Sequence, residues 1–230
     1  MKVAIVTGAS RGIGEAIARV LAGLGWRLVL AARSAEDIAF LAKELPEAIA
    51  LATDVTRPED VRRLVDTVME RWGRVDALIN NAGLTRVGPF EQVSAEDFDR
   101  LMAVNVKGPF LCTQAVLPVM RAQGSGDILN VVSIAAKRVF PEWSVYCASK
   151  FALDGMGKAL AEELKGTGIR VSAIYPGATD SPLWDVVGPD IPRGGMMRPE
   201  TVAEAVAFML AQPASARLSE LVLDPAAGDL

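Results

Sequence analysis

Two side chains of this sequence are suited to proton transfer, Tyr146 and Lys150, and they stand four positions apart in a stretch with helical character, residues 143–165. Residues at this spacing share one face of a helix. A free tyrosine has a pKa of about 10 and is a poor base at neutral pH, but a neighbouring ammonium favours the tyrosinate. The pair therefore predicts acid–base chemistry by a tyrosine. The alternative is an exposed Tyr-Lys pair without a chemical role.

The composition excludes commoner ways of doing such chemistry, because the 230 residues include no histidine and only two cysteines. Without histidine there is no Ser-His-Asp or Cys-His catalysis and no imidazole ligand for zinc. Cys112 and Cys147 cannot form a four-thiolate metal site or a secreted disulfide framework, and we interpret both as packing residues. We expect no metal, and we assign acid–base work to carboxylates, Lys, Tyr, Cys or a cofactor.

A glycine-rich segment near the N-terminus predicts a phosphate site. The run TGASRGIG follows an apolar stretch, residues 2–7, and opens a stretch with helical spacing, residues 12–24. In such a turn Gly8 allows the tight exit from a strand, Gly12 lets the backbone approach a pyrophosphate, and Gly14 permits close packing of helix and strand. The N–H groups at the start of the helix then face the anion. The alternative is a glycine-rich turn without a ligand.

The type of dinucleotide depends on the end of the second expected strand, residues 28–32. NAD sites usually place a carboxylate there for the ribose 2′-hydroxyl, but this strand is followed by Arg33, and Arg11 lies within the glycine loop. Two guanidiniums match the geometry of a 2′-phosphate. The sequence therefore favours NADP over NAD; the alternative is that both arginines are solvated surface residues.

Short β-branched runs alternate with longer amphipathic stretches along the chain, which predicts right-handed βαβ crossovers and a mostly parallel sheet. Strands are expected at residues 2–7, 28–32, 48–52, 75–80, 127–133, 169–175 and 221–223, and helices at 12–24, 35–45, 56–72, 94–120, 143–165 and 201–211. The predicted fold is α/β, a doubly wound Rossmann fold. It has a seven-stranded sheet in the order 3-2-1-4-5-6-7 and helices on both faces.

Length and charge set the broad class. At 230 residues we expect one domain, residues 1–230, in which the Pro- and Gly-rich residues 181–199 form a substrate lid. A net charge of −4 gives no footprint for nucleic acid, and no apolar run reaches the roughly 20 residues of a membrane span. We expect a cytoplasmic protein that binds neither nucleic acid nor membranes.

Four ordered motifs resemble the short-chain dehydrogenase/reductase family: TGASRGIG, the run from Asn80 to Gly83, Ser133, and Tyr146-x3-Lys150. The resemblance covers essentially the whole chain and implies a nicotinamide-dependent oxidoreductase. It implies that Tyr146 gives its proton to a carbonyl oxygen or takes one from an alcohol. It also implies that Lys150 holds the nicotinamide ribose.

Two further polar residues gain catalytic roles from the resemblance. It implies that Ser133, which we expect at the end of the fifth strand, hydrogen-bonds the substrate oxygen. It implies that Asn105, between two valines of an expected helix, supports a water relay to the lysine. Asparagine is unfavourable in a helix interior. The alternative for Asn105 is a purely structural polar residue.

The adenosine and nicotinamide ends also have expected contacts. By resemblance, the segment from Asn81 to Gly83 lies beside the adenosine ribose and Asp54 contacts adenine. The alternative for Asp54 is a capping or turn residue. The turn after the sixth strand matches the nicotinamide turn of the family, except that Thr179 stands where an apolar residue is usual. The full set of expected cofactor contacts is Gly8, Ser10, Arg11, Gly12, Ile13, Gly14, Arg33, Asp54, Val55, Asn81, Ala82, Gly83, Tyr146, Lys150, Pro176, Gly177, Thr179 and Ser181.

The substrate is less well defined. Apolar residues of the lid either cover an apolar substrate or pack on the sheet. Lys137 and Arg138 either receive a carboxylate or a phosphopantetheine arm, or are surface charges. Parts of the tail resemble a subgroup that acts on 3-hydroxy acids and serine-like substrates. The usual Gly-Gly after the last strand is replaced by a run from Asp224 to Gly228.

We therefore predict an NADP(H)-dependent oxidoreductase that acts on a small carbonyl compound or secondary alcohol. More specific alternatives are a 3-hydroxy acid dehydrogenase and a 3-oxoacyl thioester reductase. Rival classes are a non-catalytic NADP-binding sensor or scaffold and an epimerase, dehydratase or enoyl reductase on the same cofactor. Small residues at Ala148, Ala152 and Gly155 favour packing of long helices in a homodimer or homotetramer.

Overall fold

A single sheet of seven parallel strands organises the computed structural model, which describes residues 1–188 and 191–228. The strand order is β3-β2-β1-β4-β5-β6-β7 and each neighbouring pair is parallel, which confirms the predicted topology. The strands are β1 (Val3–Thr7), β2 (Arg27–Ala32), β3 (Ala48–Ala52), β4 (Ala77–Asn80), β5 (Gly126–Val131), β6 (Ile169–Pro176) and β7 (Glu220–Leu223).

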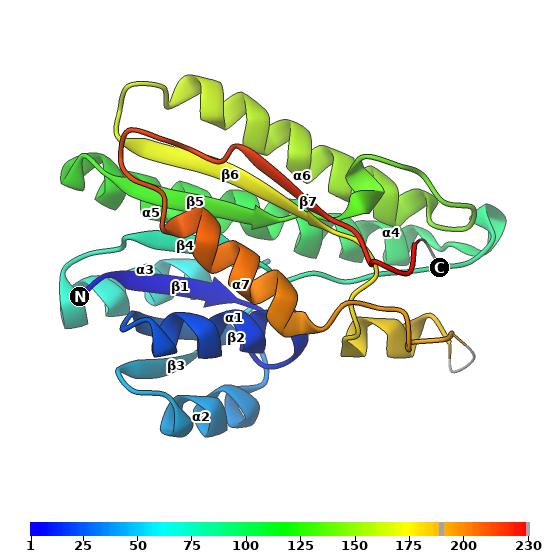
Figure 1. Ribbon diagram of the computed structural model, residues 1–230, viewed down its shortest axis with the longest axis horizontal. Coiled ribbons are helices and arrows are strands. Elements are labelled where there is room, and N and C mark those ends of the chain that lie inside the picture. The colour runs from blue at the N-terminus through cyan, green and yellow to red at the C-terminus, as the bar shows by residue number, and fades with distance from the viewer. Residues whose placement is uncertain (189–190, 229–230) are drawn as a thin grey trace.

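Helices cover both faces of this sheet (Figure 1). On one face the apolar sides of α1 (Gly12–Gly23), α2 (Ala35–Glu44) and α7 (Pro199–Leu210) pack on the strands. The other face is covered by α3 (Pro58–Trp72), α5 (Gly108–Gln123) and α6 (Ser144–Glu163). All five residues of β1 are buried, as expected for a central parallel strand covered on both faces. The carboxyl ends of the strands consequently share one edge.

The expected long helix at residues 94–120 is interrupted, which corrects the sequence prediction. The structure has α4 (Ala95–Met102), then a π-helical stretch (Ala103–Lys107), then α5. Pro109 has no N–H, so it cannot complete the α-helical hydrogen bond to the carbonyl of Asn105, and its ring would crowd that carbonyl. The wider turn relieves this conflict. Asn105 therefore lies in the π-helical stretch, not in a regular helix.

Ser133 also lies elsewhere than predicted. The strand β5 ends at Val131, two residues earlier. Ser133 instead caps a short 3₁₀ helix (Ile134–Ala136), and its Oγ accepts a hydrogen bond from the N–H of Ala135 at 3.1 Å. The cap fixes the backbone that carries Ser133 at the sheet edge.

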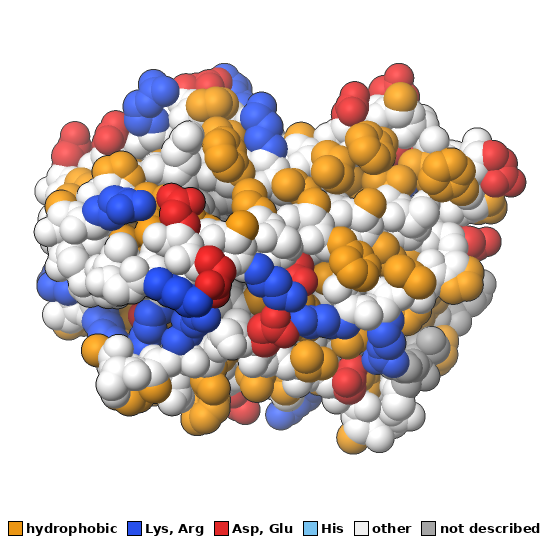
Figure 2. All heavy atoms as spheres, turned by 90° about the horizontal axis from the view of Figure 1, so that it is seen from above, with side chains coloured by type: hydrophobic (Ala, Val, Ile, Leu, Met, Phe, Trp, Pro, Cys, Tyr) orange, Lys and Arg blue, Asp and Glu red, His pale blue; other side chains and the backbone are white. Residues whose placement is uncertain are grey.

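Lys137 and Arg138 are tied to the C-terminal strand. Lys137 Nζ lies 2.6 Å from the carboxylate of Glu220, and a guanidinium nitrogen of Arg138 lies 3.2 Å from that of Asp224. Lys158 of α6 also contacts Glu220, at 3.0 Å. Side chains of both charges lie next to one another on the face seen from above (Figure 2). These pairs hold β7 against the segment that follows Ser133.

The segment expected to form a lid begins with a 3₁₀ helix (Pro182–Val186) and leads into α7. A parallel bridge joins Thr179 to Met197, so the two ends of the segment meet beside β6. Residues 189–190 of the predicted lid and residues 229–230 of the predicted domain lie outside the described part of the chain. Within the part that the structure describes, no helix is both long and apolar enough to cross a membrane.

Candidate active site

A cleft of about 1400 Å³ opens at the carboxyl edge of the sheet. Pockets for one small ligand usually measure about 300–1,000 Å³, so this cleft has room for two ligands. It is lined by every residue that the sequence predicted to contact a cofactor, and by Ser133. Asn105 does not line it, because its side chain lies behind the wall of the cleft. The glycine loop and the Tyr-Lys pair thus share one cavity.

The glycine loop has the geometry that its sequence predicts. Gly8 and Gly12 have φ angles of +65° and +59°, which side chains strongly disfavour. A Cβ atom at Gly14 would collide with the carbonyl oxygen of Gly8 and with Asn81 Nδ2. At Gly12 it would lie 3.2 Å from Cβ of Ser181, so the lid begins directly beside the loop. Glycine is required at these positions by conformation and by space.

The start of α1 fits a dinucleotide pyrophosphate. Its N-cap, Arg11, makes no side-chain capping hydrogen bond, so the first N–H groups of the helix remain available to an anion in the cleft. Asn81 holds the loop from the neighbouring strand end: its Nδ2 donates to the carbonyl oxygens of Thr7 and Gly8 at 2.9 and 3.2 Å. The loop is thereby preorganised for a bound phosphate.

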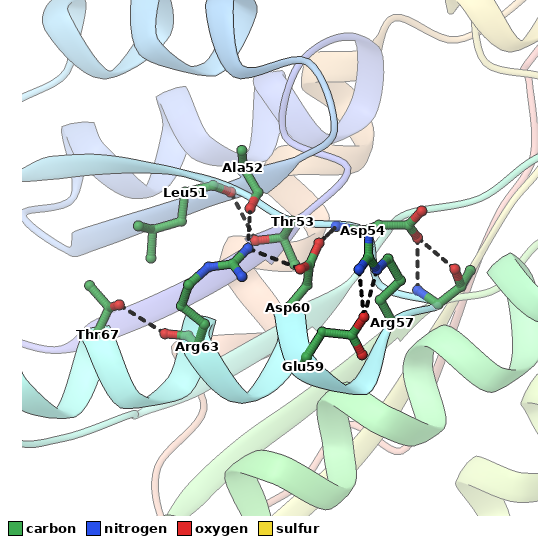
Figure 3. Close-up of polar contacts among 10 residues, drawn as sticks. Leu51, Ala52, Thr53, Asp54, Arg57, Glu59, Asp60, Arg63 and Thr67 are labelled. Atoms are coloured by element: carbon green, nitrogen blue, oxygen red, sulfur yellow. Dashed lines mark hydrogen bonds and ion pairs between the residues drawn. The ribbon is translucent and has the colours of Figure 1, made fainter.

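Asp54 and Val55 line the cleft, and Asp54 is held by the polar contacts drawn in Figure 3. The N–H of Asp54 donates to the carboxylate of Asp60 at 2.9 Å, and this hydrogen bond is the main cause that lowers the pKa of Asp60. Oδ1 of Asp54 accepts from the N–H and hydroxyl of Thr56 at 2.9 and 2.7 Å. Asp54 is therefore both a turn residue and a fixed wall residue; the two interpretations of the sequence are compatible.

Arg11 and Arg33 both line the cleft, as does Ala32 at the end of β2. Both guanidiniums are exposed, and neither makes an ion pair with any residue in the described ranges. Asp37, in the first turn of α2, also lines the cleft.

Tyr146 and Lys150 lie on the buried face of α6, 7% and 5% exposed. Lys150 Nζ lies 5.6 Å from the centre of the Tyr146 ring and donates to the carbonyl of Val131 at 3.2 Å. Burial raises the pKa of Tyr146 to about 12, while a hydrogen bond with Ser133 acts in the opposite direction. Burial lowers the pKa of Lys150 to about 8. At neutral pH the protein alone thus holds a neutral phenol beside an ammonium.

Asn105 connects the buried face of α6 to Leu84, which lies in the segment after β4 and lines the cleft. Its amide nitrogen donates to the carbonyl of Leu84 and to Ser149 Oγ, both at 2.9 Å. Its amide oxygen accepts from the N–H of Leu84 at 2.8 Å. Ser149 in turn donates to the carbonyl of Tyr146 at 2.7 Å. Asn105 therefore positions both the cleft wall and the helix that carries Tyr146.

Two residues near the reacting centre escaped the sequence analysis. Ser149, between Tyr146 and Lys150, is fully buried and completes the Asn105 network. Trp143 precedes Tyr146 by three positions, and the two ring centres lie 5.5 Å apart. The sequence could have predicted the contact of Trp143 with Tyr146, because residues three positions apart are neighbours on a helix.

Comparison with known proteins agrees with this geometry. The sequence profile of the family described as short chain dehydrogenase matches residues 2–191. The chain belongs to the short-chain dehydrogenase/reductase family. It is therefore an oxidoreductase with a nicotinamide cofactor.

Individual members of the family match nearly the whole chain. Sepiapterin reductase of Chlorobaculum tepidum is 35% identical over 237 residues, covering 98% of this chain and 97% of that protein. A 3-ketoacyl-(acyl-carrier-protein) reductase from Brucella melitensis, complexed with NADH, has a TM-score of 0.91 at 35% identity, covering 98% of each chain. An alcohol dehydrogenase from Thermococcus sibiricus, complexed with 5-hydroxy-NADP, has a TM-score of 0.92 at 34% identity, covering 100% of this chain and 99% of that one.

Replacing Gly14 by alanine tests the packing of the loop. The added methyl group meets the Gly8 carbonyl, so we expect Gly14→Ala to weaken NADPH binding about tenfold or more, a loss of about 1.4 kcal/mol, in a fluorescence titration. Gly23→Ala in the same helix is the matched control, because no atom lies within 4 Å of its added Cβ. Equal NADPH affinity in the two variants would contradict this account of the loop.

Proposed function

We propose that the protein is an NADP(H)-dependent oxidoreductase that interconverts a small carbonyl compound and a secondary alcohol, with Tyr146 as the acid and base. The observation that carries the proposal is the placement of Tyr146, Ser133 and Lys150 in the cleft that the glycine loop also lines. A protein that only binds a dinucleotide does not need a buried phenol and a buried ammonium beside each other. The set therefore favours an enzyme over a sensor.

The state of Tyr146 fits the direction of reduction. Its pKa of about 12 keeps the phenol protonated at neutral pH, ready to give its proton to a carbonyl oxygen. Ser133, which acts to lower the pKa of Tyr146, would hold the same oxygen and stabilise its developing negative charge. Alcohol oxidation requires the tyrosinate, so a positive charge must enter the site before Tyr146 can act as the base.

Lys150 is already beside Tyr146, and the pKa of the phenol is about 12 with this lysine in place. With a pKa of about 8 Lys150 is mostly protonated at pH 7, so the site holds one positive charge before a cofactor binds. Its ammonium lines the cleft and would donate hydrogen bonds to the hydroxyls of the nicotinamide ribose. When bound, the nicotinamide cofactor supplies or accepts the hydride, and its oxidised ring is positive. Asn105 acts on this pair by holding Leu84 and Ser149 in place.

The cofactor preference follows from Arg11 and Arg33. Both are available to a 2′-phosphate, and no carboxylate follows the end of β2 directly. The relatives support a nicotinamide cofactor of either type, since one is described with NADH and another with an NADP derivative. The two guanidiniums support NADP for this chain.

The structure removes one argument for a substrate with a carboxylate or a phosphopantetheine arm. Lys137 and Arg138 are engaged with Glu220 and Asp224, and neither lines the cleft. The named relatives act on different carbonyl or alcohol substrates. For this chain we therefore propose only the general class of reaction, the interconversion of a carbonyl compound and an alcohol. The exposed side of α6, which includes Ala148, Phe151 and Gly155, supports the expected homodimer or homotetramer as a packing surface.

Tyr146→Phe tests the proposed mechanism. Removing the hydroxyl removes the proton donor, so we expect kcat for carbonyl reduction to fall about 10²- to 10⁴-fold while the Kd for NADPH stays within about twofold. Turnover is followed by NADPH absorbance and binding by NADPH fluorescence. Wild-type rates in this variant would refute Tyr146 as the acid.

Ala32→Asp tests the cofactor preference. A carboxylate at the end of β2 would repel a 2′-phosphate and accept a hydrogen bond from a 2′-hydroxyl, so kcat/KM for NADPH relative to NADH should fall about 10- to 100-fold. Ala32→Asn has nearly the same shape without the charge and is the matched control. A ratio unchanged by aspartate would show that Arg11 and Arg33 do not set the preference.

A further inference from the structure

Four aromatic rings form a continuous wall on the substrate side of the cleft. The ring centre of Trp143 lies 5.5 Å from Tyr146, 5.7 Å from Trp184 and 6.4 Å from Phe140, with edge-to-face geometry in each pair. All four residues line the cleft, and Phe140, Trp143 and Trp184 are each only partly buried. The wall therefore begins at the proposed proton donor and continues onto the lid.

Trp184 is held in one orientation. Its indole N–H donates to the carbonyl of Thr179 at 2.9 Å, and Thr179 Oγ1 donates to the carbonyl of Gly177 at 3.0 Å. Arg193 pairs with Asp185, the residue next to Trp184, at 2.6 Å. The indole is thus anchored to the turn after β6 and to the rest of the lid, so a ligand that contacts it loses little binding energy in ordering it.

Trp143 is held from the helix side. Its carbonyl accepts the N–H of Cys147 at 2.8 Å in the first turn of α6, and its own N–H donates to the carbonyl of Phe140 at 3.2 Å. Its side chain packs against the buried cluster that contains Tyr146, Val145 and Leu101. Both indoles are therefore part of a preformed surface.

The group bonded to the reacting carbonyl must lie next to this wall, because the carbonyl oxygen must reach Tyr146. The aliphatic residues Leu183, Val186 and Val187 complete the lid side of the cleft. Aromatic rings attract one another beyond the effect of buried area, through edge-to-face and offset stacking. A flat ring gains this energy on Trp143 and Trp184, whereas a saturated ring of similar size does not.

We propose that the substrate is an aryl carbonyl compound, one with a planar aromatic ring attached directly to the reacting carbonyl carbon. Trp143 and Trp184 are the residues that determine this specificity. The proposal deepens the proposed function and rests on it, since Tyr146 must donate the proton to the same carbonyl.

The test compares acetophenone with cyclohexyl methyl ketone, which differ in the flatness of the ring. Because the two ketones differ in intrinsic reactivity, the measured quantity is the change in their ratio of kcat/KM between wild type and variant. We expect Trp143→Leu and Trp184→Leu each to lower the aryl preference about 3- to 10-fold. Trp184→Phe, which keeps an aromatic face, should retain most of it. Melting temperatures verify that each variant is folded.

Binding provides a readout that does not need turnover. Trp143 and Trp184 are two of four tryptophans in the chain, so acetophenone added to the NADP complex should quench their emission. The double variant Trp143→Phe/Trp184→Phe shows how much of the quenching comes from the other two tryptophans. Cyclohexyl methyl ketone is the matched ligand control.

The outcomes separate the two proposals. A preference ratio unchanged in both leucine variants, or equal quenching by the two ketones, overturns the aromatic site. If no carbonyl is reduced by the wild type, the proposed function fails; the quenching experiment then decides the aromatic site alone.

Discussion

The burial of a phenol and an ammonium on one face of α6 is the constraint on which the site depends. Each group is costly to charge in an apolar setting, so Tyr146 stays neutral and Lys150 becomes easier to deprotonate. In the proposed mechanism they form a proton donor, and the pKa of that donor would respond to any charge that enters the cleft. Ser133 and Asn105 fix the two segments that meet this face, at the end of β5 and in the π-helical stretch.

The parallel sheet makes this arrangement possible because every strand delivers its following loop to the same edge. The glycine loop after β1, the Asn81 segment after β4 and the Ser133 segment after β5 meet there without long connections. The start of α1 lies so close to the end of β1 and to Asn81 that Gly14 has no room for a side chain. The lid then lies beside the same loop through Ser181.

Sequence reasoning predicted the elements whose signals are local, and missed those that depend on distant contacts. Strand order and the cleft lining followed from periodicity and family motifs. The π-helical turn did not, although Pro109 marks the broken hydrogen bond. The pairing of Lys137 with Glu220 and the contact of Trp143 with Trp184 join segments far apart in the chain. No spacing rule predicts such contacts.

The central claim is that Tyr146 is a neutral acid until positive charge enters the cleft. Tyrosinate absorbance measures this directly, because the chain has only two tyrosines and Tyr175→Phe leaves Tyr146 alone. Without ligand, we predict almost no tyrosinate up to about pH 10.5, since burial raises the pKa to about 12. Saturating NADP⁺ should bring the titration to about pH 7–9. Titration near pH 10 with and without NADP⁺ would contradict the account.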